Sequence, residues 1–226
     1  MRILLAAIHW PIASGRYYTR AFRRLGHDVR TIGPETGNKI WGMEVDPKYI
    51  WTPEPPEEGW QPDLAINCDH NFVLNHPLNG CRKIVIGVDN HVRPYDFPGV
   101  DFEAMFLCHS WGARMGEPNV YWLPPGYDPE AHFDMGIERD IDIGMVAVPY
   151  PERQEIFGKL NEAGFKIFAS TGLLFEEYNT VYNHFKIALV KSACGDVPQR
   201  FLEGMAQGCC VLSDRPMVDA DKLGFV

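Results

Sequence analysis

The segment Asp196–Asp214 combines the charged side chains of Arg200 and Glu203 with the start of a predicted helix. Pro198 is typical of the first helical position, and Gly208 suits the left-handed conformation that ends a helix before a strand. A helix start carries unpaired N–H groups and a partial positive charge, which together favour a phosphate group. Arg200 and Glu203 are three residues apart and share one helix face. We therefore expect Arg200 to contact a diphosphate; the alternative is an exposed Arg200–Glu203 pair.

A second group of polar residues follows predicted strands in the first half of the chain. Asp89 and His91 come after the apolar run Lys83–Val88, and Asp69 and His70 follow another such run. Side chains at these positions project from the carboxyl edge of a parallel sheet, where open α/β sheets bind ligands. A histidine there, oriented by a carboxylate, is suited to take a proton from a hydroxyl group. We expect this role of His91 with Asp89; the alternative is a turn that His91 caps.

Four further residues are weaker candidates for contact with phosphate. Arg153 and Lys191 would add positive charge, with ordinary surface charge as the alternative. Ser14 and Gly15 begin a predicted helix and could present N–H groups to a phosphate, although a tight turn without a ligand fits equally well. No divalent metal site is expected, because the Asp-x-Asp at residues 140–142 begins a predicted buried strand.

The elements that would position these residues alternate between strands and helices. In the first half, six apolar runs of strand length accompany one predicted helix, Gly15–Leu25, and the proline-rich stretch Gly33–Trp60 is predicted as an extended connection. The predicted strands are Ile3–Ile8, Val29–Ile32, Leu64–Asn67, Lys83–Val88, Ala104–Cys108 and Val120–Leu123. This order is typical of a doubly wound α/β sheet.

Residues 124–139 are predicted to link two domains. Pro124, Pro125 and Pro129 exclude both a central strand and a helix interior. After them the alternation restarts, with strands at Ile141–Ala147, Phe165–Ala169, Lys186–Val190 and Cys209–Leu212 and helices at Glu152–Glu162, Glu176–His184 and Pro198–Gln207. We therefore predict an α/β protein of two Rossmann-like domains, residues 1–123 and 140–226. Because no closing helix follows the last strand, the C-terminal domain is expected to be incomplete.

Composition and missing signatures narrow the functional classes. The chain has 226 residues, 46% of them hydrophobic, and a net charge of −9, which opposes binding to nucleic acid. No apolar run is long enough to span a membrane, and the opening Met1–Leu5 is too short for a secretory signal, which predicts a cytoplasmic location. The six cysteines include no Cys-x-x-Cys pair, so reduced thiols are expected. Neither Gly-x-Gly-x-x-Gly after the first strand nor a P-loop motif is present, which disfavours dinucleotide oxidoreductases and P-loop enzymes.

The segment Asp196–Asp214 resembles the donor-site motif of GT-B glycosyltransferases, in which a Glu near the middle of such a helix binds the nucleotide ribose. The closer resemblance is to the CgeB-like (spore maturation protein) branch, a glycosyl transferase family 1-like group. Its members carry an Arg-Phe-Glu-type version followed by Ala-x-Gly and a strand. The resemblance extends along most of the chain, through Met1–Leu4, Tyr17–Tyr18 and Leu25–Val29 in the acceptor domain, Leu123–Pro129 in the linker, and Ile141–Gly144 with Arg153 in the donor domain.

This resemblance implies a metal-independent glycosyltransferase without a cofactor. It would move a sugar from a nucleotide-diphosphate sugar to the hydroxyl of an unidentified acceptor. Glu203 would hold the ribose, a role that suits a carboxylate facing a vicinal diol. The donor site would then comprise Glu203, Arg200, Arg153, Lys191 and Pro198, and the base would be His91 or Asp89.

One departure from the family pattern keeps two alternatives open. The wider superfamily often has a second Glu, eight positions before the first, that contacts the donor sugar; here that position is Gly195. A non-catalytic nucleotide-sugar-binding module, or an inactive fragment of such an enzyme, would bind the donor without turnover. A sugar-nucleotide epimerase of the same architecture would convert a nucleotide sugar without any acceptor.

Overall fold

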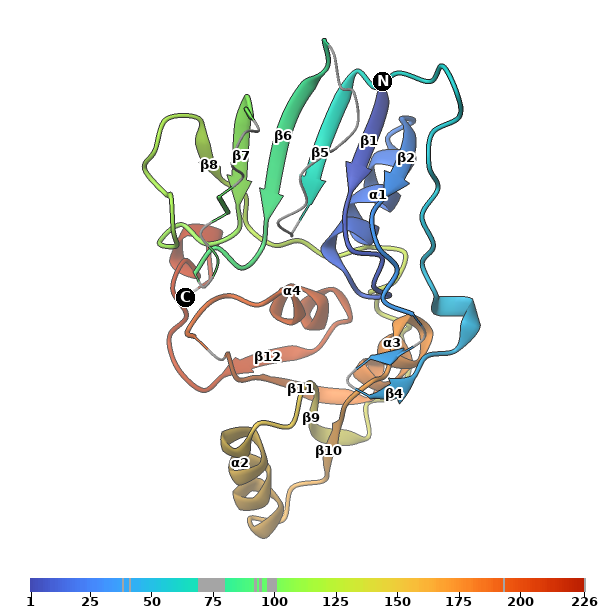
Figure 1. The fold of residues 1–226 in the computed structure, drawn as a ribbon. Helices are drawn as coiled ribbons and strands as arrows, with labels where there is room; N and C mark the ends of the chain where they lie inside the picture. Colours follow the sequence, from blue (N-terminus) through green and yellow to red (C-terminus); the bar gives the residue numbers. More distant parts are fainter. Residues whose placement is uncertain are drawn as a thin grey trace. The chain divides into compact units, whose positions relative to one another are not determined.

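The computed structural model describes residues 1–37, 39–40, 42–68, 80–91, 93, 95–96, 101–192 and 194–225. The chain divides into two compact units, Met1–Pro124 and Pro125–Val226, each with its own parallel sheet (Figure 1). The boundary lies between two adjacent prolines at the start of the predicted linker. The two units are described separately below.

The first unit contains a six-stranded parallel sheet in the order β2-β1-β5-β6-β7-β8. Its strands are β1 (Arg2–Ala6), β2 (Asp28–Ile32), β5 (Leu64–Cys68), β6 (Arg82–Gly87), β7 (Ala104–Leu107) and β8 (Val120–Trp122). All six strands that the sequence predicts are therefore confirmed, with ends that differ by one or two residues. Strands β1 and β5 are almost entirely buried, as is the second half of β6, which explains why these stretches appear in the sequence as apolar runs.

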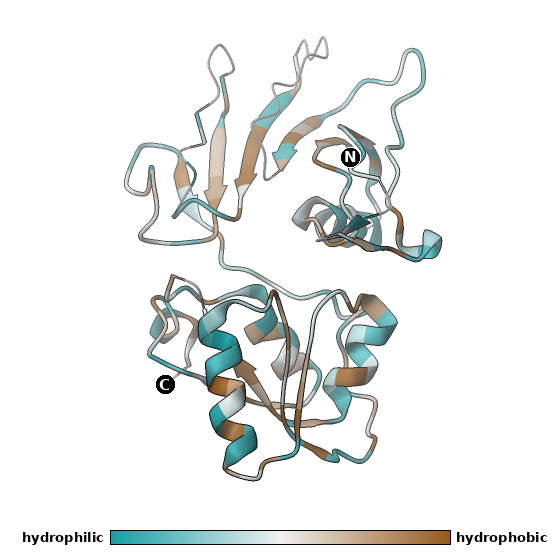
Figure 2. Cartoon of the chain, turned by 60° about the horizontal axis from the view of Figure 1, so that its bottom comes forward, coloured by the Kyte–Doolittle hydropathy of each residue, from teal (hydrophilic) through white to brown (hydrophobic). Residues whose placement is uncertain are grey.

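Alternate residues of β1 pack on opposite faces of this sheet. Ile3 and Leu5 share a core with Trp51 and with Tyr18 and Phe22 of helix α1 (Ser14–Arg24), whereas Leu4 and Ala6 pack on the other face. Figure 2 shows hydrophobic stretches (brown) along the strands, whereas the helices carry both brown and teal residues. Helix α1 ends before Gly26, which has φ +79°, as predicted.

The stretch predicted as an extended connection also contains short regular elements. Two-residue strands β3 (Lys39–Ile40) and β4 (Met43–Glu44) form a hairpin, and a 3-10 helix covers Pro47–Tyr49. Elements this short leave no periodic pattern in a sequence. The same connection also covers the edge of β2, because Thr31 and Glu54 exchange backbone hydrogen bonds of 2.9 and 3.0 Å.

The second unit contains a four-stranded parallel sheet in the order β10-β9-β11-β12. Its elements are β9 (Ile141–Val146), α2 (Pro151–Glu162), β10 (Ile167–Ser170), α3 (Phe175–Asn183), β11 (Phe185–Val190), α4 (Gln199–Ala206) and β12 (Cys210–Ser213). The sequence predicts all seven. The start of α4 is one residue later than predicted: Pro198 is the N-cap, with the extended angles φ −77° and ψ 155°. Gly208 does end the helix in the left-handed conformation, at φ +78°.

Helices cover both faces of the second sheet. Phe157 of α2 packs with Ile143, Met145 and Leu189 on one face. Tyr182 of α3 and Phe201 of α4 belong to the two clusters that pack on alternate strand residues, including Ala188 and Val190. Short connections run from the carboxyl ends of β9 and β11 to the starts of α2 and α4. The predicted phosphate-binding residues Arg153 and Arg200 lie at these two helix starts.

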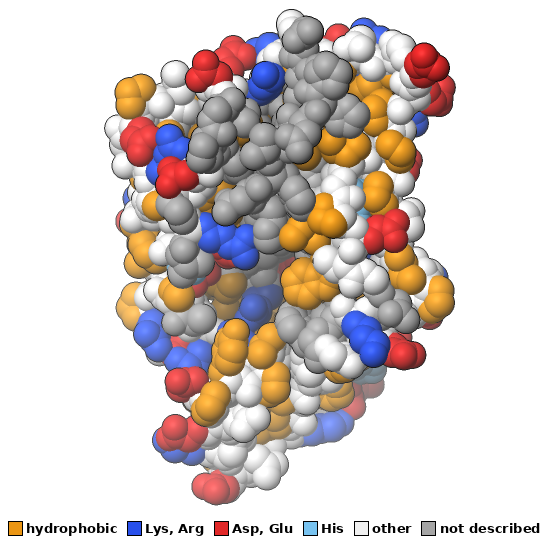
Figure 3. Space-filling model, viewed as in Figure 1, with side chains coloured by type: hydrophobic (Ala, Val, Ile, Leu, Met, Phe, Trp, Pro, Cys, Tyr) orange, Lys and Arg blue, Asp and Glu red, His pale blue; other side chains and the backbone are white. Residues whose placement is uncertain are grey.

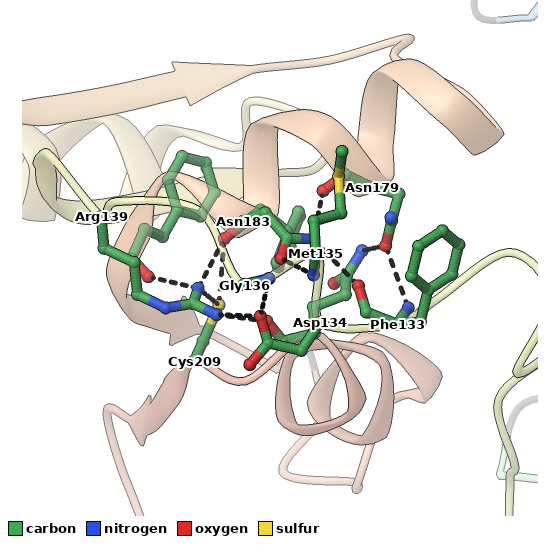
Figure 4. Close-up of polar contacts among 11 residues, drawn as sticks. Phe133, Asp134, Met135, Gly136, Arg139, Asn179, Asn183 and Cys209 are labelled. Atoms are coloured by element: carbon green, nitrogen blue, oxygen red, sulfur yellow. Dashed lines mark hydrogen bonds and ion pairs between the residues drawn. The ribbon is translucent and has the colours of Figure 1, made fainter.

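The segment just before β9, residues 133–139, was predicted as part of the linker but is hydrogen-bonded to the second unit. Backbone N–H groups of Phe133 and Met135 donate to the side chains of Asn179 and Asn183 at 3.1 and 2.7 Å (Figure 4). The Arg139 guanidinium donates to the backbone oxygens of Tyr182, Phe185 and Gln207 at 3.3, 3.0 and 2.7 Å. The residues that precede β9 are thus structurally part of this unit.

Among the helices in the described ranges, none has the length and apolarity needed to cross a bilayer.

Candidate functional site

Arg153 lies at the carboxyl end of the second sheet, where it contacts the residues that follow β9 and β11. Its side chain extends from α2 and donates to the backbone oxygens of Val148 and Lys191, both at 2.8 Å. Only 5% of the residue is exposed. Burial lowers the pKa of Arg153, and the positive charge of Arg200 lowers it further. Two guanidinium groups therefore lie close enough to repel each other.

Arg200 is the cation with unused hydrogen-bonding capacity at this position. It is the second residue of α4, and its Nη1 atom is buried without a hydrogen-bond partner among the residues that the structure describes. An unpaired buried donor on a charged group is costly unless an acceptor reaches it. An anion between Arg200 and Arg153 would supply that acceptor and offset their repulsion.

Lys191 differs from these two arginines because its charge is already paired. Its Nζ lies 2.9 Å from an Asp214 carboxylate oxygen, and the two side chains are only 13% and 16% exposed. Burial acts to raise the pKa of Asp214, but hydrogen bonds from Lys191 and Arg215 prevail and lower it. This ion pair joins the end of β11 to the residue after β12.

The carboxylate of Glu203 lies inside the second unit, held from two sides. The Tyr178 hydroxyl of α3 donates to its Oε2 atom at 2.8 Å, and the His132 Nε2 atom is 3.5 Å from its Oε1 atom. Glu203 is 7% exposed. Burial, together with the charge of Glu203, raises the pKa of Tyr178 well above its usual value, so this phenol remains a donor.

The turn before α4 gives a physical reason for the glycine at position 195. Ser192 Oγ accepts from the N–H groups of Cys194 and Gly195 at 3.2 and 2.8 Å and donates to the Asp196 carboxylate. Gly195 has φ +80°, a conformation that strains residues with a side chain. A Glu here would be held in an unfavourable backbone conformation.

A cavity of about 500 Å³ lies beside Arg153 in the same unit. Met145 and Phe157 form part of its apolar wall, and Thr171 contributes a hydroxyl that is buried without a partner among the described residues. Apolar walls with a few polar groups are typical of small-molecule sites.

In the first unit, the loops after β6 and β7 bring three rings together. The His91 ring lies 4.5 Å from that of His109 and 5.7 Å from that of Trp111, between ring centroids. Asn90, fully buried, connects the loops: its side chain donates to the His109 oxygen at 2.8 Å and accepts from the His109 N–H at 2.9 Å. The predicted orientation by a carboxylate is not seen, because the His91 Nδ1 atom has no hydrogen-bond partner in the described ranges; the Asp89 N–H donates to the Tyr95 hydroxyl.

The start of α1 is shaped by packing. A Cβ atom on Gly15 would lie 2.6 Å from the Ala7 Cβ and 3.2 Å from the Trp51 ring, so only glycine fits this contact between helix and strand. Ser14 is the first residue of the helix, after Ala13, which provides no side-chain cap.

The acidic residues at the start of β9 are engaged in ion pairs. Asp140 pairs with Lys166 and His184, and Asp142 pairs with Lys186. In the part of the chain that the structure describes, no three His, Cys, Asp or Glu residues are grouped to hold a metal ion. On the face shown in Figure 3, acidic and basic side chains are interspersed and neither sign forms a continuous area.

No family model matches this chain, and no curated protein sequence matches it. Solved structures, in contrast, are similar to this chain. An alpha-glucosyltransferase in complex with UDP and a 13-mer DNA with a central A:G mismatch has a TM-score of 0.62 at 12% identity, over 94% of this chain and 79% of that chain. Sucrose-phosphate synthase from Thermosynechococcus elongatus has a TM-score of 0.56 at 13% identity, over 98% and 83%. The fold is that of GT-B glycosyltransferases.

Three of the predicted residues of the second unit lie near one another: Arg153 donates to the Lys191 backbone oxygen, and the charge of Arg200 acts on Arg153. Glu203 contacts Tyr178 and His132 instead. His132 and Tyr178, the partners of Glu203, were not predicted. Neither were His109 and Trp111, the ring neighbours of His91. Each lies far in the sequence from the residue it contacts, so spacing provides no signal. The predicted pair Asp69–His70 lies outside the described residues.

Proposed function

We propose that this protein transfers a sugar from a nucleoside-diphosphate sugar to the hydroxyl group of an acceptor, with residues 140–226 as the donor domain and residues 1–123 as the acceptor domain. The observation that carries the proposal is the unpaired Nη1 of Arg200, beside Arg153, at the start of α4 in a GT-B fold. A diphosphate is an anion that matches two adjacent guanidinium groups.

In this proposal the donor site acts on the leaving group. As the bond between sugar and diphosphate breaks, negative charge develops on the diphosphate, and Arg200, Arg153 and the N–H groups after Pro198 stabilise it without a metal ion. Glu203 accepts hydrogen bonds from the ribose, and the cavity beside Arg153 suits the planar base. Lys191 contributes through the backbone oxygen that holds Arg153.

The acceptor side is proposed to lie at the loop after β6. His91 or Asp89 would take the proton from the acceptor hydroxyl, because both follow a strand at the carboxyl edge of the sheet. The Asn90 contacts fix the backbone of this loop. Ser14 and Gly15 begin α1 at the same edge of the sheet, where Ser14 presents a helix start.

Calorimetric titration tests the donor site. UDP, ADP, GDP and their glucose conjugates are titrated into the wild-type chain, Arg200→Ala, Glu203→Gln and Lys159→Ala. Arg200→Ala should weaken binding about 10- to 100-fold, as expected for a lost charged hydrogen bond. Lys159→Ala removes an exposed cation from the same unit and should have no effect. Equal affinity of Arg200→Ala and wild type, or a wild type that binds none of these nucleotides, would overturn the proposal.

Gly195 occurs where the resemblance to GT-B glycosyltransferases would place a second Glu, and this favours one alternative, a module that binds the nucleotide sugar without transfer. Turnover separates the two functions: release of nucleoside diphosphate that depends on Arg200 supports transfer, whereas binding without release supports the module. An epimerase would instead convert the nucleotide sugar with no acceptor present.

A further inference from the structure

Two groups from different elements surround the Glu203 carboxylate. Tyr178 comes from α3, and its hydroxyl donates to Oε2 at 2.8 Å. His132 comes from the segment before β9, and its Nε2 atom is 3.5 Å from Oε1. Their side chains leave the carboxylate little contact with solvent: the Glu203 side chain is 10% exposed and that of His132 is 2% exposed.

The hydrogen bonds of His132 indicate which of its nitrogen atoms carries the proton. Its Nδ1 atom accepts a hydrogen bond from the Asp128 N–H at 3.3 Å. In a neutral imidazole one nitrogen accepts and the other donates, so the proton is on Nε2, the atom that faces Glu203. Tyr178 therefore donates a hydrogen bond to the carboxylate, and His132 presents its N–H toward the other oxygen at 3.5 Å.

Both donors are held firmly in place. The rings of His132 and Tyr178 meet edge to face at 5.7 Å, and Tyr178 stacks on Tyr182 at 4.3 Å. The residues after His132 are hydrogen-bonded to α3 through Asn179 and Asn183 (Figure 4). Neither donor can turn away from Glu203 without breaking these contacts.

We propose that His132 and Tyr178 are positioning residues that make the donor site select ribose over deoxyribose. This inference rests on the proposed function. A carboxylate accepts about four hydrogen bonds. With one site on each oxygen directed at Tyr178 and His132, about one site on each oxygen remains, and two such sites match two vicinal hydroxyls. A site built around two hydroxyls rejects a ligand that lacks one, because a buried acceptor is then left unpaired.

The test compares the dissociation constants of UDP, ADP and GDP with those of their 2′-deoxy counterparts. The wild type should prefer the ribonucleotide by about 10-fold or more. Tyr178→Phe removes one oxygen, and His132→Asn removes the donor at the Nε2 position; each should reduce the preference to about threefold while binding of the deoxynucleotide changes little. His132→Gln places an amide N–H near the Nε2 position and should restore the preference. His184→Gln changes a partly exposed histidine of the same unit and should match the wild type.

The outcomes separate a positioning role from a structural one. If Tyr178→Phe and His132→Asn unfold more readily but keep the wild-type preference, the two residues only hold the unit together and the inference is wrong. The same conclusion follows if wild type and Glu203→Gln show no preference while diphosphates still bind. A wild type that binds no nucleotide removes the proposed function as well. Should His132→Asn fail to fold, Tyr178→Phe alone decides the question.

Discussion

Arg139 ties the segment before β9 to the ends of two helices, and its loss should destabilise the second unit selectively. Its guanidinium donates to the oxygens of Tyr182, Phe185 and Gln207 at 3.3, 3.0 and 2.7 Å and to Asp134 at 3.1 Å. Tyr182 lies in the last turn of α3, and Gln207 is the C-cap of α4. The cation therefore also faces the negative ends of two helix dipoles.

The expected magnitude follows from these contacts. A hydrogen bond from a charged donor contributes about 1.5–3 kcal/mol. Because the Arg139 side chain is 19% exposed, water replaces part of what is lost. We expect Arg139→Gln to lower the free energy of unfolding of the second unit by about 3 kcal/mol. Arg139→Lys should cost about half as much, since lysine keeps the charge but lacks the planar fork.

The distribution of tryptophan allows each unit to be followed by itself. All six tryptophans, Trp10, Trp41, Trp51, Trp60, Trp111 and Trp122, lie in the first unit. In urea, tryptophan fluorescence reports unfolding of the first unit, and far-UV circular dichroism reports both. With a slope of about 1.5 kcal/mol per molar urea, Arg139→Gln should lower the midpoint of the second-unit transition by about 2 M. The fluorescence transition should stay unchanged.

Two results would refute this reasoning. A second-unit midpoint within about 0.3 M of wild type would mean that these hydrogen bonds of Arg139 to oxygen atoms contribute little. An equal shift of the fluorescence transition would mean that the two units unfold together.

Three further predictions concern other buried groups. His9 is 1% exposed, and burial lowers its pKa to about 4, so below pH 6.5 the unfolded chain binds a proton that the folded chain excludes. The free energy of unfolding of the first unit should therefore fall by about 3 kcal/mol between pH 7 and pH 4. In fluorescence-detected urea titrations, His9→Gln should remove this pH-dependent loss. A Cβ on Gly144 would lie 2.3 Å from the Phe185 ring, whereas one on Gly158 would meet nothing within 4 Å. Gly144→Ala should therefore destabilise the second unit by about 1–3 kcal/mol, whereas Gly158→Ala should stabilise it by about 0.5–1 kcal/mol. Equal changes in the unfolding midpoint of the two variants, followed by circular dichroism, would contradict this prediction. Iodoacetamide at pH 8 should modify the exposed Cys194 and Cys210 but spare the adjacent Cys209, because burial raises the pKa of Cys209 to about 11. Modification of Cys209 in the folded protein, detected by peptide mass spectrometry, would contradict this prediction.

The fold could be predicted from sequence because buried parallel strands leave a strong signal. Strands such as β1 and β5 are covered on both faces, so nearly every residue in them is apolar. The glycines at helix ends, such as Gly26 and Gly208, mark the boundaries because their positive φ excludes most other residues. The hairpin of β3 and β4 left no such signal, because strands of two residues are too short to show an alternating pattern.

The candidate site was predictable only in part. Helical spacing placed Arg200 and Glu203 on one face, and strand ends placed Asp89 and His91 at the edge of a sheet. The partners of these residues come from other elements, as His132 and Tyr178 do for Glu203. Such contacts depend on how the chain packs, and spacing along one element carries no information about them.

The same limit explains why the three predicted cations of the second unit are not equivalent. They differ in the kind of acceptor that each of them contacts. The partner of Lys191 is a carboxylate, so its charge is compensated and an added anion gains little there. Arg153 donates to backbone oxygens, which satisfy its hydrogen bonds but leave its charge in place. Among the described residues, Arg200 has an unused donor and no ion pair. An anion that binds here should therefore be drawn first to Arg200, and the charge of Arg153 should strengthen the attraction.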